Sequence, residues 1–385
     1  MKKVLLVVES NKSGGIQTVV NNLAQKLKNK YEVTILYLMG KESNLFPLNI
    51  PKIIVLRQIA MIIKIVSLFL KLKTERYDYI ISNGSFSNFF VGLVINKKEK
   101  TIATIHSVQS KEAKRKSFYS KLCNLSNKLL LKNFSVIIGV SLEIIKDLEI
   151  TYPKLVNKKK YCVYNGFNIE KIKKLSMEIN EFSKEKYFIF IGRLVKEKQI
   201  DELLKLYFNY SKNGYNDKFL IIGSGEEEDR IKEIIIKYNL KNKVILLGNQ
   251  ENPYKYLKNA KALLLCSKYE GLPSVIIESL ILGVPIISTE CCLGIWEIVS
   301  RKKIKITENY ITQYGIISPY IGSGLSKSEG LTKEEKEYIK AMEYLSKSNL
   351  KNKFNNKLVV EKFDDLKNFK KIKKIMENMN ENKIL

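Results

Sequence analysis

Short runs of apolar residues recur along the first 165 residues, with segments of helical periodicity between several of them. The helical segments include Ile16–Lys28 and Ser141–Ile150. Near-continuous Val, Ile and Leu runs indicate strands that are buried on both faces, and therefore a parallel sheet. The alternation of strand and helix predicts a doubly wound α/β domain. The predicted strands are Val4–Val8, Val33–Leu38, Ile53–Leu56, Tyr79–Ile81, Thr101–Ile105, Val136–Gly139 and Tyr161–Val163.

A polar, lysine-rich segment from Asn168 to Lys186 interrupts this pattern, which then begins again. The second series predicts strands at Tyr187–Ile191, Phe219–Ile222, Val244–Leu247, Ala262–Leu265 and Pro285–Ser288. Its predicted helices are Ile200–Ser211, Glu226–Tyr238 and Ser274–Leu282. The chain after Thr332 is charged and helical in pattern, with no further strand.

These patterns predict two Rossmann-like α/β domains, residues 1–167 and residues 168–365. We expect a last helix, at about 366–385, to pack back on the first domain. Ligands of such parallel sheets bind beyond the carboxyl ends of the strands. Two sheets of this kind would face a common cleft, which is the expected ligand site.

Composition removes several classes of protein. The chain has 385 residues, of which 45% are hydrophobic and 28% charged, which is typical of globular proteins and not of disordered or fibrous ones. The single histidine, His106, excludes multi-histidine zinc sites and any mechanism that needs two imidazoles. Five cysteines without a CxxC pair indicate reduced thiols in a cytosolic protein.

The apolar segments are too short for membrane insertion. The first run ends at Glu9 after five apolar residues, which favours a buried strand over a signal peptide. Ile59–Leu72 is interrupted by Lys64 and Lys71, whereas a spanning helix needs roughly 20 apolar residues. We therefore expect no transmembrane helix.

Positive charge is concentrated in the first half of the chain. The whole chain has 67 Lys and Arg against 39 Asp and Glu, a net charge of +28. Residues 1–160 hold 28 basic and 10 acidic residues, and the remainder holds 39 and 29. This excess has two interpretations: a lysine-rich composition without a function, or an anionic partner such as a membrane surface or a phosphorylated substrate. Zinc-finger spacing, RNP aromatics and basic-zipper heptads are absent from the sequence, so we expect no nucleic-acid partner.

One basic segment has the pattern of a membrane-surface helix. Between residues 111 and 132, basic residues interleave with Phe118, Tyr119 and Leu122. Such a pattern suits an anionic membrane surface, although a helix packed on the sheet is the alternative. For most of Ile59–Leu70 we expect the packed helix. The predicted membrane-surface residues are Lys114, Arg115, Lys116 and Lys121.

Glycines follow several predicted strands. Gly14 and Gly15 follow the first strand, and Gly223 and Gly225 follow the strand that ends at Ile222. Glycine at a strand-to-helix turn lets the backbone approach a ligand closely. Since three glutamates follow Gly225, we expect that loop to flank a base or ribose and not to hold a phosphate. Ordinary flexible loops are the alternative.

Two cations and two carboxylates follow strands of the second domain. Gly192 precedes Arg193 and Lys198, whose guanidinium and ammonium groups suit a diphosphate. Glu270 lies in the loop before a helix that starts at Pro273–Ser274, and Glu278 lies about one turn inside that helix. Two carboxylates beside the amide groups of Gly271 and Leu272 suit a sugar attached to a nucleotide. Solvated surface charges and a capped helix are the alternatives.

The pair Glu270 and Glu278, set in Tyr-Glu-Gly-Leu-Pro-Ser, resembles the E-x7-E signature of retaining GT-B glycosyltransferases of the large sucrose-synthase-like family. The resemblance extends over most of the chain. Residues 288–298 are also similar to a segment of bacterial members that build surface polysaccharides and lipid-linked glycans. Further matching pieces follow in the family's order: the early Gly-Gly loop, His106, Val140-Ser141, Asn165-Gly166-Phe167, Gly192-Arg193 with Lys198, and Gly223-x-Gly225.

The resemblance implies a role for each of these residues. Arg193 and Lys198 would hold the donor diphosphate and stabilise the leaving group without a metal, Glu278 would bind the ribose, and Glu270 would contact the donor sugar. The amides of Gly271 and Leu272 would lie alongside Glu270. Gly14 and Gly15 would close on the phosphates from the first domain, and His106 would lie near the donor sugar.

The sequence thus predicts a retaining GT-B glycosyltransferase that needs no cofactor. It would move a hexose or N-acetylhexosamine from a nucleotide sugar, UDP-linked, to a lipid-linked glycan in the synthesis of capsule, O-antigen or lipopolysaccharide. We expect a cytoplasmic protein, peripheral on the inner face of the membrane. A nucleotide-sugar epimerase and a non-catalytic glycan- or nucleotide-binding scaffold are the alternatives, although one histidine and few cleft carboxylates argue against the epimerase.

Overall fold

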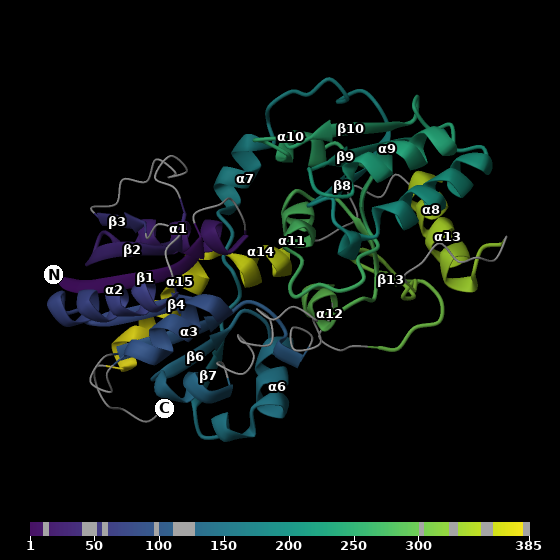
Figure 1. The fold of residues 1–385 in the computed structure, drawn as a ribbon. Coiled ribbons are helices and arrows are strands. Elements are labelled where there is room, and N and C mark those ends of the chain that lie inside the picture. Colours follow the sequence, from purple (N-terminus) through teal and green to yellow (C-terminus); the bar gives the residue numbers. More distant parts are fainter. Residues whose placement is uncertain are drawn as a thin grey trace. The chain divides into compact units, whose positions relative to one another are not determined.

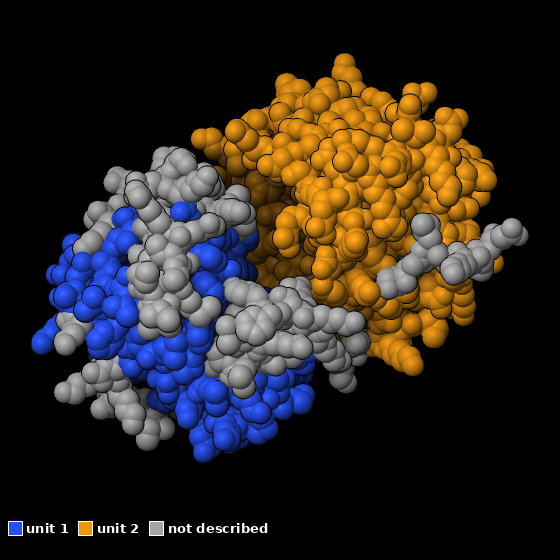
Figure 2. All heavy atoms as spheres, viewed as in Figure 1, with its two compact units in different colours: residues 1–166, 365–385 blue, residues 167–364 orange. Residues whose placement is uncertain are grey.

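The chain forms two compact units (Figures 1 and 2). Unit 1 comprises residues 1–166 and 365–385, and unit 2 comprises residues 167–364. The sequence-predicted boundaries lie next to these divisions. The structure is a computed structural model that describes residues 1–10, 15–40, 52–55, 61–95, 100–110, 128–299, 304–322, 330–347 and 357–379.

Unit 1 contains a seven-stranded parallel sheet in the order β3-β2-β1-β4-β5-β6-β7. The central strand, β1, is buried on both faces, and Val4 to Val8 are 0% exposed. This burial explains the uninterrupted apolar run in the sequence. The predicted strands of this half are confirmed. Their bounds are β1 Lys2–Ser10, β2 Tyr31–Met39, β3 Lys52–Val55, β4 Tyr79–Asn83, β5 Lys100–Ile105, β6 Val136–Gly139 and β7 Lys159–Cys162.

Helices cover both faces of this sheet. Alternate residues of a strand point to opposite faces. Val4 and Leu6 pack in one core cluster with α1 and α15, whereas Leu5 and Val7 pack in the other with α2, α3 and α6. The helix bounds are α1 Gly15–Leu27, α2 Met61–Thr74, α3 Ser85–Val94, α6 Leu142–Thr151 and α15 Asp365–Asn378, with short 3₁₀ turns η2 at Leu131–Asn133 and η3 at Pro153–Leu155.

The last helix, α15, is part of the core of unit 1 although it is about 200 residues away from the rest of that unit along the chain. Ile375 and Met376 are buried in the cluster that also holds Val4 and Leu27. An ion pair of 2.9 Å between Lys26 Nζ and Asp365 Oδ2 joins the start of α15 to α1.

Unit 2 contains a second seven-stranded sheet, in the order β10-β9-β8-β11-β12-β14-β13. The strands that the sequence predicts here are confirmed, and all of them pair in parallel. The predicted parallel sheet is confirmed, and the short strand β13, which the sequence did not predict, pairs antiparallel with β14 at one edge. The bounds are β8 Tyr187–Ile191, β9 Lys218–Ile222, β10 Val244–Gly248, β11 Ala262–Leu265, β12 Ile286–Thr289, β13 Tyr310–Thr312 and β14 Gly315–Ser318.

The helices of unit 2 include one inside the polar segment that interrupts the sequence pattern. This helix, α7, begins where the Asn168 side chain accepts a hydrogen bond of 2.9 Å from the Lys171 amide, which is a regular N-cap. Helix α7 packs against α10 and α11. The bounds are α7 Ile169–Leu175, α8 Ile200–Lys212, α9 Glu228–Lys237, α10 Tyr254–Leu257, α11 Ser274–Ile281, α12 Leu293–Val299, α13 Lys333–Lys347 and α14 Lys357–Phe363, with a 3₁₀ turn η4 at Lys196–Lys198.

None of the helices in the described ranges combines the length and the apolar character that a membrane-spanning helix needs.

Candidate active site

The predicted cations of unit 2 lie in the segment between β8 and α8. Gly192 follows β8 directly, and Lys198 ends the turn η4. Gln199 then adopts a left-handed conformation with φ of 49° and starts α8. Arg193 is exposed, and its guanidinium has neither an ion pair nor a hydrogen bond within the described part of the chain. Arg193 is therefore available to an anion from solvent.

Lys198 and Glu270 are in direct contact. Lys198 Nζ lies 2.5 Å from Glu270 Oε1, and the two side chains are 20% and 15% exposed. Ser267 Oγ donates a hydrogen bond of 2.8 Å to the same oxygen. Both interactions end on Oε1, and no described residue bonds to Oε2, which can therefore accept a hydrogen bond from a ligand. The structure thus brings together two predicted site residues that are 72 positions apart in the chain.

Two further hydrogen bonds hold the Glu270 loop against the η4 turn. The Lys268 amide donates to the Glu197 carbonyl at 2.8 Å, and Tyr269 Oη donates to Glu197 Oε1 at 2.9 Å. The two loops are therefore fixed to each other through Glu197, which the sequence analysis did not select. A preformed position of the ammonium group is what electrostatic stabilisation of a leaving group requires.

The glycines after β8 and β9 pack against each other. The Gly192 amide donates to the Ile222 carbonyl at 3.0 Å, and the Leu194 amide donates to the Ser224 carbonyl at 2.9 Å. A Cβ atom on Gly223 would lie 1.9 Å from the Gly192 carbonyl oxygen, and one on Gly225 would lie 2.2 Å from the Leu194 oxygen. Close packing of the two loops thus requires both glycines in the absence of any ligand, and their place beside a base or ribose stays a prediction.

Replacing Gly225 by alanine therefore has a predicted cost in stability. The new methyl group overlaps backbone atoms, which cannot move aside as the end of a side chain can. We expect Gly225→Ala to lower the free energy of unfolding by about 2 kcal/mol or more. Urea denaturation measures this, and Gly330→Ala is the control because a Cβ atom there meets no atom within 4 Å. An unchanged midpoint for Gly225→Ala would show that the two loops are not packed in this way.

Glu278, the second predicted carboxylate, lies on α11 and is partly buried. Tyr254 Oη, from the start of α10, donates a hydrogen bond of 3.2 Å to Glu278 Oε1. Burial raises the pKa of Glu278 to about 7, and the bond from Tyr254 acts in the opposite direction. Burial also raises the pKa of Tyr254, which keeps its hydroxyl protonated as a donor. The Glu278 carboxyl can therefore gain or lose a proton near neutral pH.

Tyr254 was not among the sequence-predicted residues. It follows Asn252 and Pro253 after β10, 24 positions before its partner, and no spacing rule connects the two. Only the fold brings α10 and α11 together, since both pack against α7.

The start of α12 supports the loop that carries Gly271 and Leu272. A Cβ atom on Gly294 would lie 2.0 Å from the Gly271 carbonyl oxygen, so the two backbones are in contact. Cys292 Sγ donates to the same oxygen at 3.6 Å. These residues belong to the segment from Ser288 to Ile298 that the sequence analysis singled out. In the structure that segment holds the loop in front of α11.

The remaining predicted residues belong to unit 1. His106 follows β5, and burial lowers its pKa to about 4, so the imidazole is neutral at pH 7. Its Nε2 atom is buried and has no hydrogen-bond partner among the residues that the structure describes. Gly15 is the first residue of α1. Gly14 and the predicted membrane-surface residues Lys114, Arg115, Lys116 and Lys121 lie outside the described residues.

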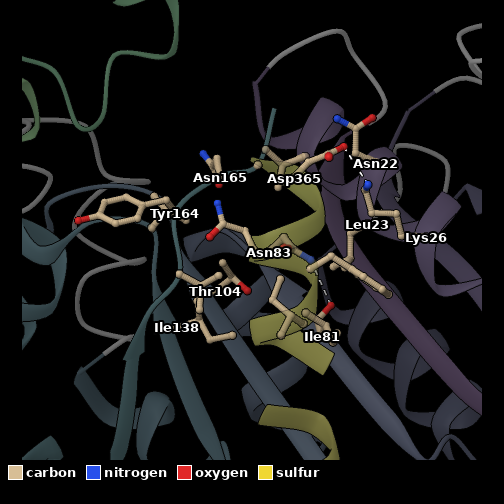
Figure 3. A pocket seen from close by; sticks show the side chains of 17 residues that line it. Asn22, Leu23, Lys26, Ile81, Asn83, Thr104, Ile138, Tyr164, Asn165 and Asp365 are labelled. Atoms are coloured by element: carbon tan, nitrogen blue, oxygen red, sulfur yellow. Dashed lines mark hydrogen bonds and ion pairs between the residues drawn. The ribbon is translucent and has the colours of Figure 1, made fainter. Parts of the chain in front are cut away.

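Unit 1 also contains a small cavity that the sequence did not predict (Figure 3). It lies between α1 and α15 at the carboxyl ends of β4, β5 and β6, and its volume is about 50 Å³. Asn83, Thr104 and the Lys26–Asp365 pair contribute polar groups to its lining. This volume accommodates a few water molecules.

Within the described ranges, no group of three or more His, Cys, Asp or Glu side chains could hold a metal ion. Lys198 places a positive charge next to Glu270, and Arg193 lies nearby in sequence.

Two family profiles match successive parts of the chain. The family described as Glycosyltransferase Family 4 matches residues 13–171, and the family described as Glycosyl transferases group 1 matches residues 171–313. The second range contains Arg193, Lys198, Glu270 and Glu278.

Relatives of this chain include glycosyltransferases from archaea and bacteria. An uncharacterized glycosyltransferase of Methanocaldococcus jannaschii is 36% identical over 216 residues, which are 54% of this chain and 53% of that protein's length. The Campylobacter jejuni enzyme named N-acetylgalactosamine-N,N'-diacetylbacillosaminyl-diphospho-undecaprenol 4-alpha-N-acetylgalactosaminyltransferase is 26% identical over 305 residues. That match covers 75% of this chain and 81% of the enzyme.

Solved structures share the fold over the whole chain. The Anabaena protein HepE, solved in complex with UDP-glucose, superposes with a TM-score of 0.74 at 15% identity. The superposition covers 98% of this chain and 100% of HepE.

Proposed function

Since the chain belongs to the group 1 glycosyltransferases with the GT-B fold, we propose that it transfers a hexose or N-acetylhexosamine from a UDP-sugar to a lipid-linked glycan, with retention of configuration. The contact between Lys198 and Glu270 carries this proposal. It joins a cation for the diphosphate to a carboxylate for the sugar hydroxyls. Glu278, from the same unit, would bind the ribose.

The proposed reaction needs charge stabilisation and positioning more than proton transfer. The acceptor hydroxyl oxygen forms a bond to the anomeric carbon of the donor while the bond from that carbon to the diphosphate oxygen breaks. The leaving diphosphate keeps the electron pair and takes the hydroxyl proton. Lys198 and Arg193 would stabilise the charge that develops on it. The neutral His106 would offer a hydrogen bond near the sugar and not a positive charge.

The acceptor and the cellular location are also part of the proposal. The name of the Campylobacter relative gives it a diphospho-undecaprenol-linked acceptor. We extend this to a lipid-linked glycan of surface polysaccharide synthesis at the inner face of the cytoplasmic membrane. The excess of basic residues in the first half of the chain supports an anionic surface nearby.

Thermal stabilisation by nucleotides tests the donor site. A ligand at 100 times its Kd stabilises the folded state by about 2.7 kcal/mol, so binding raises the melting temperature. We expect UDP and UDP-sugars to raise it more than the GDP or ADP series. Glu278→Ala should abolish the shift. Glu233→Ala, an exposed glutamate of α9, is the matched control and should retain it. No shift with any nucleotide would contradict the proposed donor site.

Product analysis separates the alternatives. Incubation of a UDP-sugar with bacterial lipid extract should give sugar in the lipid fraction. An isomerised donor sugar would instead indicate an epimerase, and binding without turnover would indicate a scaffold.

A further inference from the structure

Helix α2 exposes an apolar stripe on the surface of unit 1. Val66, Phe69 and Leu70 are 49%, 49% and 52% exposed. Their spacing places them on one face of the helix. Leu68 and Leu72 of the same helix are buried in the core. The sequence predicts a helix packed on the sheet for most of Ile59–Leu70. In the described part of α2, Leu68 and Leu72 pack in the core, and Val66, Phe69 and Leu70 are exposed.

Two further apolar side chains are exposed on neighbouring elements of unit 1. Helix α3 packs against α2, and its residue Leu93 is 45% exposed. Leu129, which precedes η2, is 51% exposed. Leu93 and Leu129 follow Gly92 and precede Leu130 in sequence, and these two neighbours are in contact. A Cβ atom on Gly92 would lie 2.8 Å from the Leu130 Cβ atom. We call Val66, Phe69, Leu70, Leu93 and Leu129 the α2 face.

Charge decides which partner this face can accept. Unit 1 holds 34 Lys and Arg against 13 Asp and Glu, a net charge of +21, whereas unit 2 holds 33 against 26, a net charge of +7. Lys128 and Lys132, on either side of Leu129 in sequence, are exposed. A second copy of the chain would bring the same large positive charge to the interface, which opposes self-association. An anionic lipid surface attracts each such residue by about 1 kcal/mol.

We propose that the α2 face docks the chain on an anionic lipid bilayer. Phe69 and its neighbours enter the boundary between headgroups and acyl chains, and the exposed Lys128 and Lys132 contact the headgroups. Helix α2 lies in the plane of the membrane surface in this arrangement and does not cross it. The inference rests on the proposed function in one respect, since a docked enzyme meets an acceptor that is carried on a lipid.

Vesicle flotation tests the docking directly. The wild-type chain should float with vesicles of phosphatidylcholine and phosphatidylglycerol and remain behind with phosphatidylcholine alone. The triple variant Val66→Ser/Phe69→Ser/Leu70→Ser should bind the anionic vesicles about tenfold more weakly or worse, because it loses three large apolar side chains from the interface. Ile179→Ser/Ile236→Ser removes two side chains of unit 2 that are 87% and 58% exposed, and should bind as the wild type does.

Several results would overturn the proposal. Equal recovery of the wild type with both kinds of vesicle would exclude docking driven by charge. Docking would belong instead to the basic segment that the sequence predicted if the triple variant binds fully and a second variant does not. That second variant is Lys114→Ala/Arg115→Ala/Lys116→Ala/Lys121→Ala. Light scattering would assign the α2 face to self-association if the wild type is a dimer and the triple variant is a monomer.

The donor site provides an independent readout. The triple variant should keep the full thermal shift with UDP, because its substitutions lie in unit 1 and the proposed nucleotide contacts of Glu278 and Lys198 lie in unit 2. Loss of vesicle binding with an intact UDP shift supports the docking face. Loss of both would show that the triple variant is misfolded. The milder variant Phe69→Ser then decides: it must weaken binding to anionic vesicles while its UDP shift stays intact. If it does not, the proposal fails.

Discussion

Lys198→Ala is expected to lower the rate of sugar transfer by about 10²–10³-fold, which is the typical effect of removing one group that stabilises charge in a transition state. The ammonium group lies 2.5 Å from Glu270 in the free protein, so it is already in place for a donor whose sugar contacts that carboxylate. Transfer of labelled sugar from the UDP-sugar to a lipid extract measures the effect. Lys196→Ala, an exposed lysine of the same turn, is the matched control and should keep normal activity.

A change in folding must be separated from this loss of activity. The Lys198–Glu270 pair is partly exposed, so we expect its removal to change stability little compared with the change in rate. The double variant Lys198→Ala/Glu270→Gln removes the unpaired carboxylate and should be as inactive as the single variant. Wild-type turnover in Lys198→Ala would remove Lys198 from the donor site.

UDP is expected to bind about tenfold more weakly at about pH 6 than at about pH 8, because a carboxylate that accepts hydrogen bonds from ribose hydroxyls must be ionised. The pKa of Glu278 is about 7 in the free protein, so below that value binding must first remove a proton. Glu278→Gln should bind UDP weakly at both pH values, without this dependence. Isothermal titration at several pH values measures the affinities.

Tyr254→Phe provides the sharper test of the same pair. It removes the hydrogen bond that lowers the Glu278 pKa, so the rise in affinity should shift to higher pH. Phenylalanine fills the same space, so a purely structural role for Tyr254 would leave the pH profile unchanged. Affinity that is independent of pH in the wild type would show that Glu278 does not contact the ribose.

Protonation of the Glu278 carboxyl group weakens UDP binding but favours the folded state. Its pKa in the folded protein lies above the ordinary value of 4.5. The unfolded chain therefore loses this proton at a lower pH than the folded chain does. The contribution of Glu278 to the free energy of unfolding is full below about pH 4.5 and is lost as the pH rises through about 7.

The sequence pattern predicted the fold where strands are buried on both faces. Runs such as Val4–Val8 have no polar interruption because helices cover both sides of the sheet. The pattern missed β13 and β14, which have three and four residues, and it missed α7. Those elements carry too few apolar positions for a period to be visible, and contacts with other parts of unit 2 determine their structure.

The sequence identified residues of the candidate site but did not predict which of them are in contact. Glu270 and Glu278 were found from their spacing, and Lys198 from its place after a strand. Tyr254, which bonds to Glu278, and Glu197, which holds the Glu270 loop, have no distinguishing neighbours in the sequence. Gly223 shows a second limit of prediction from sequence. It packs against the Gly192 backbone, but a glycine that leaves room for a ligand has the same sequence pattern.

The position of α15 in unit 1 has a consequence for synthesis of the chain on the ribosome. Val4, Leu6 and Leu27 are synthesised before unit 2, but Ile375 and Met376, which belong to the same cluster, are synthesised after it. At typical rates of about 5–20 residues per second, the ribosome needs about 10–40 s to make the intervening unit. Residues 1–166 thus wait with an uncovered apolar surface while unit 2 is made, and the core of unit 1 is complete only after α15 has emerged.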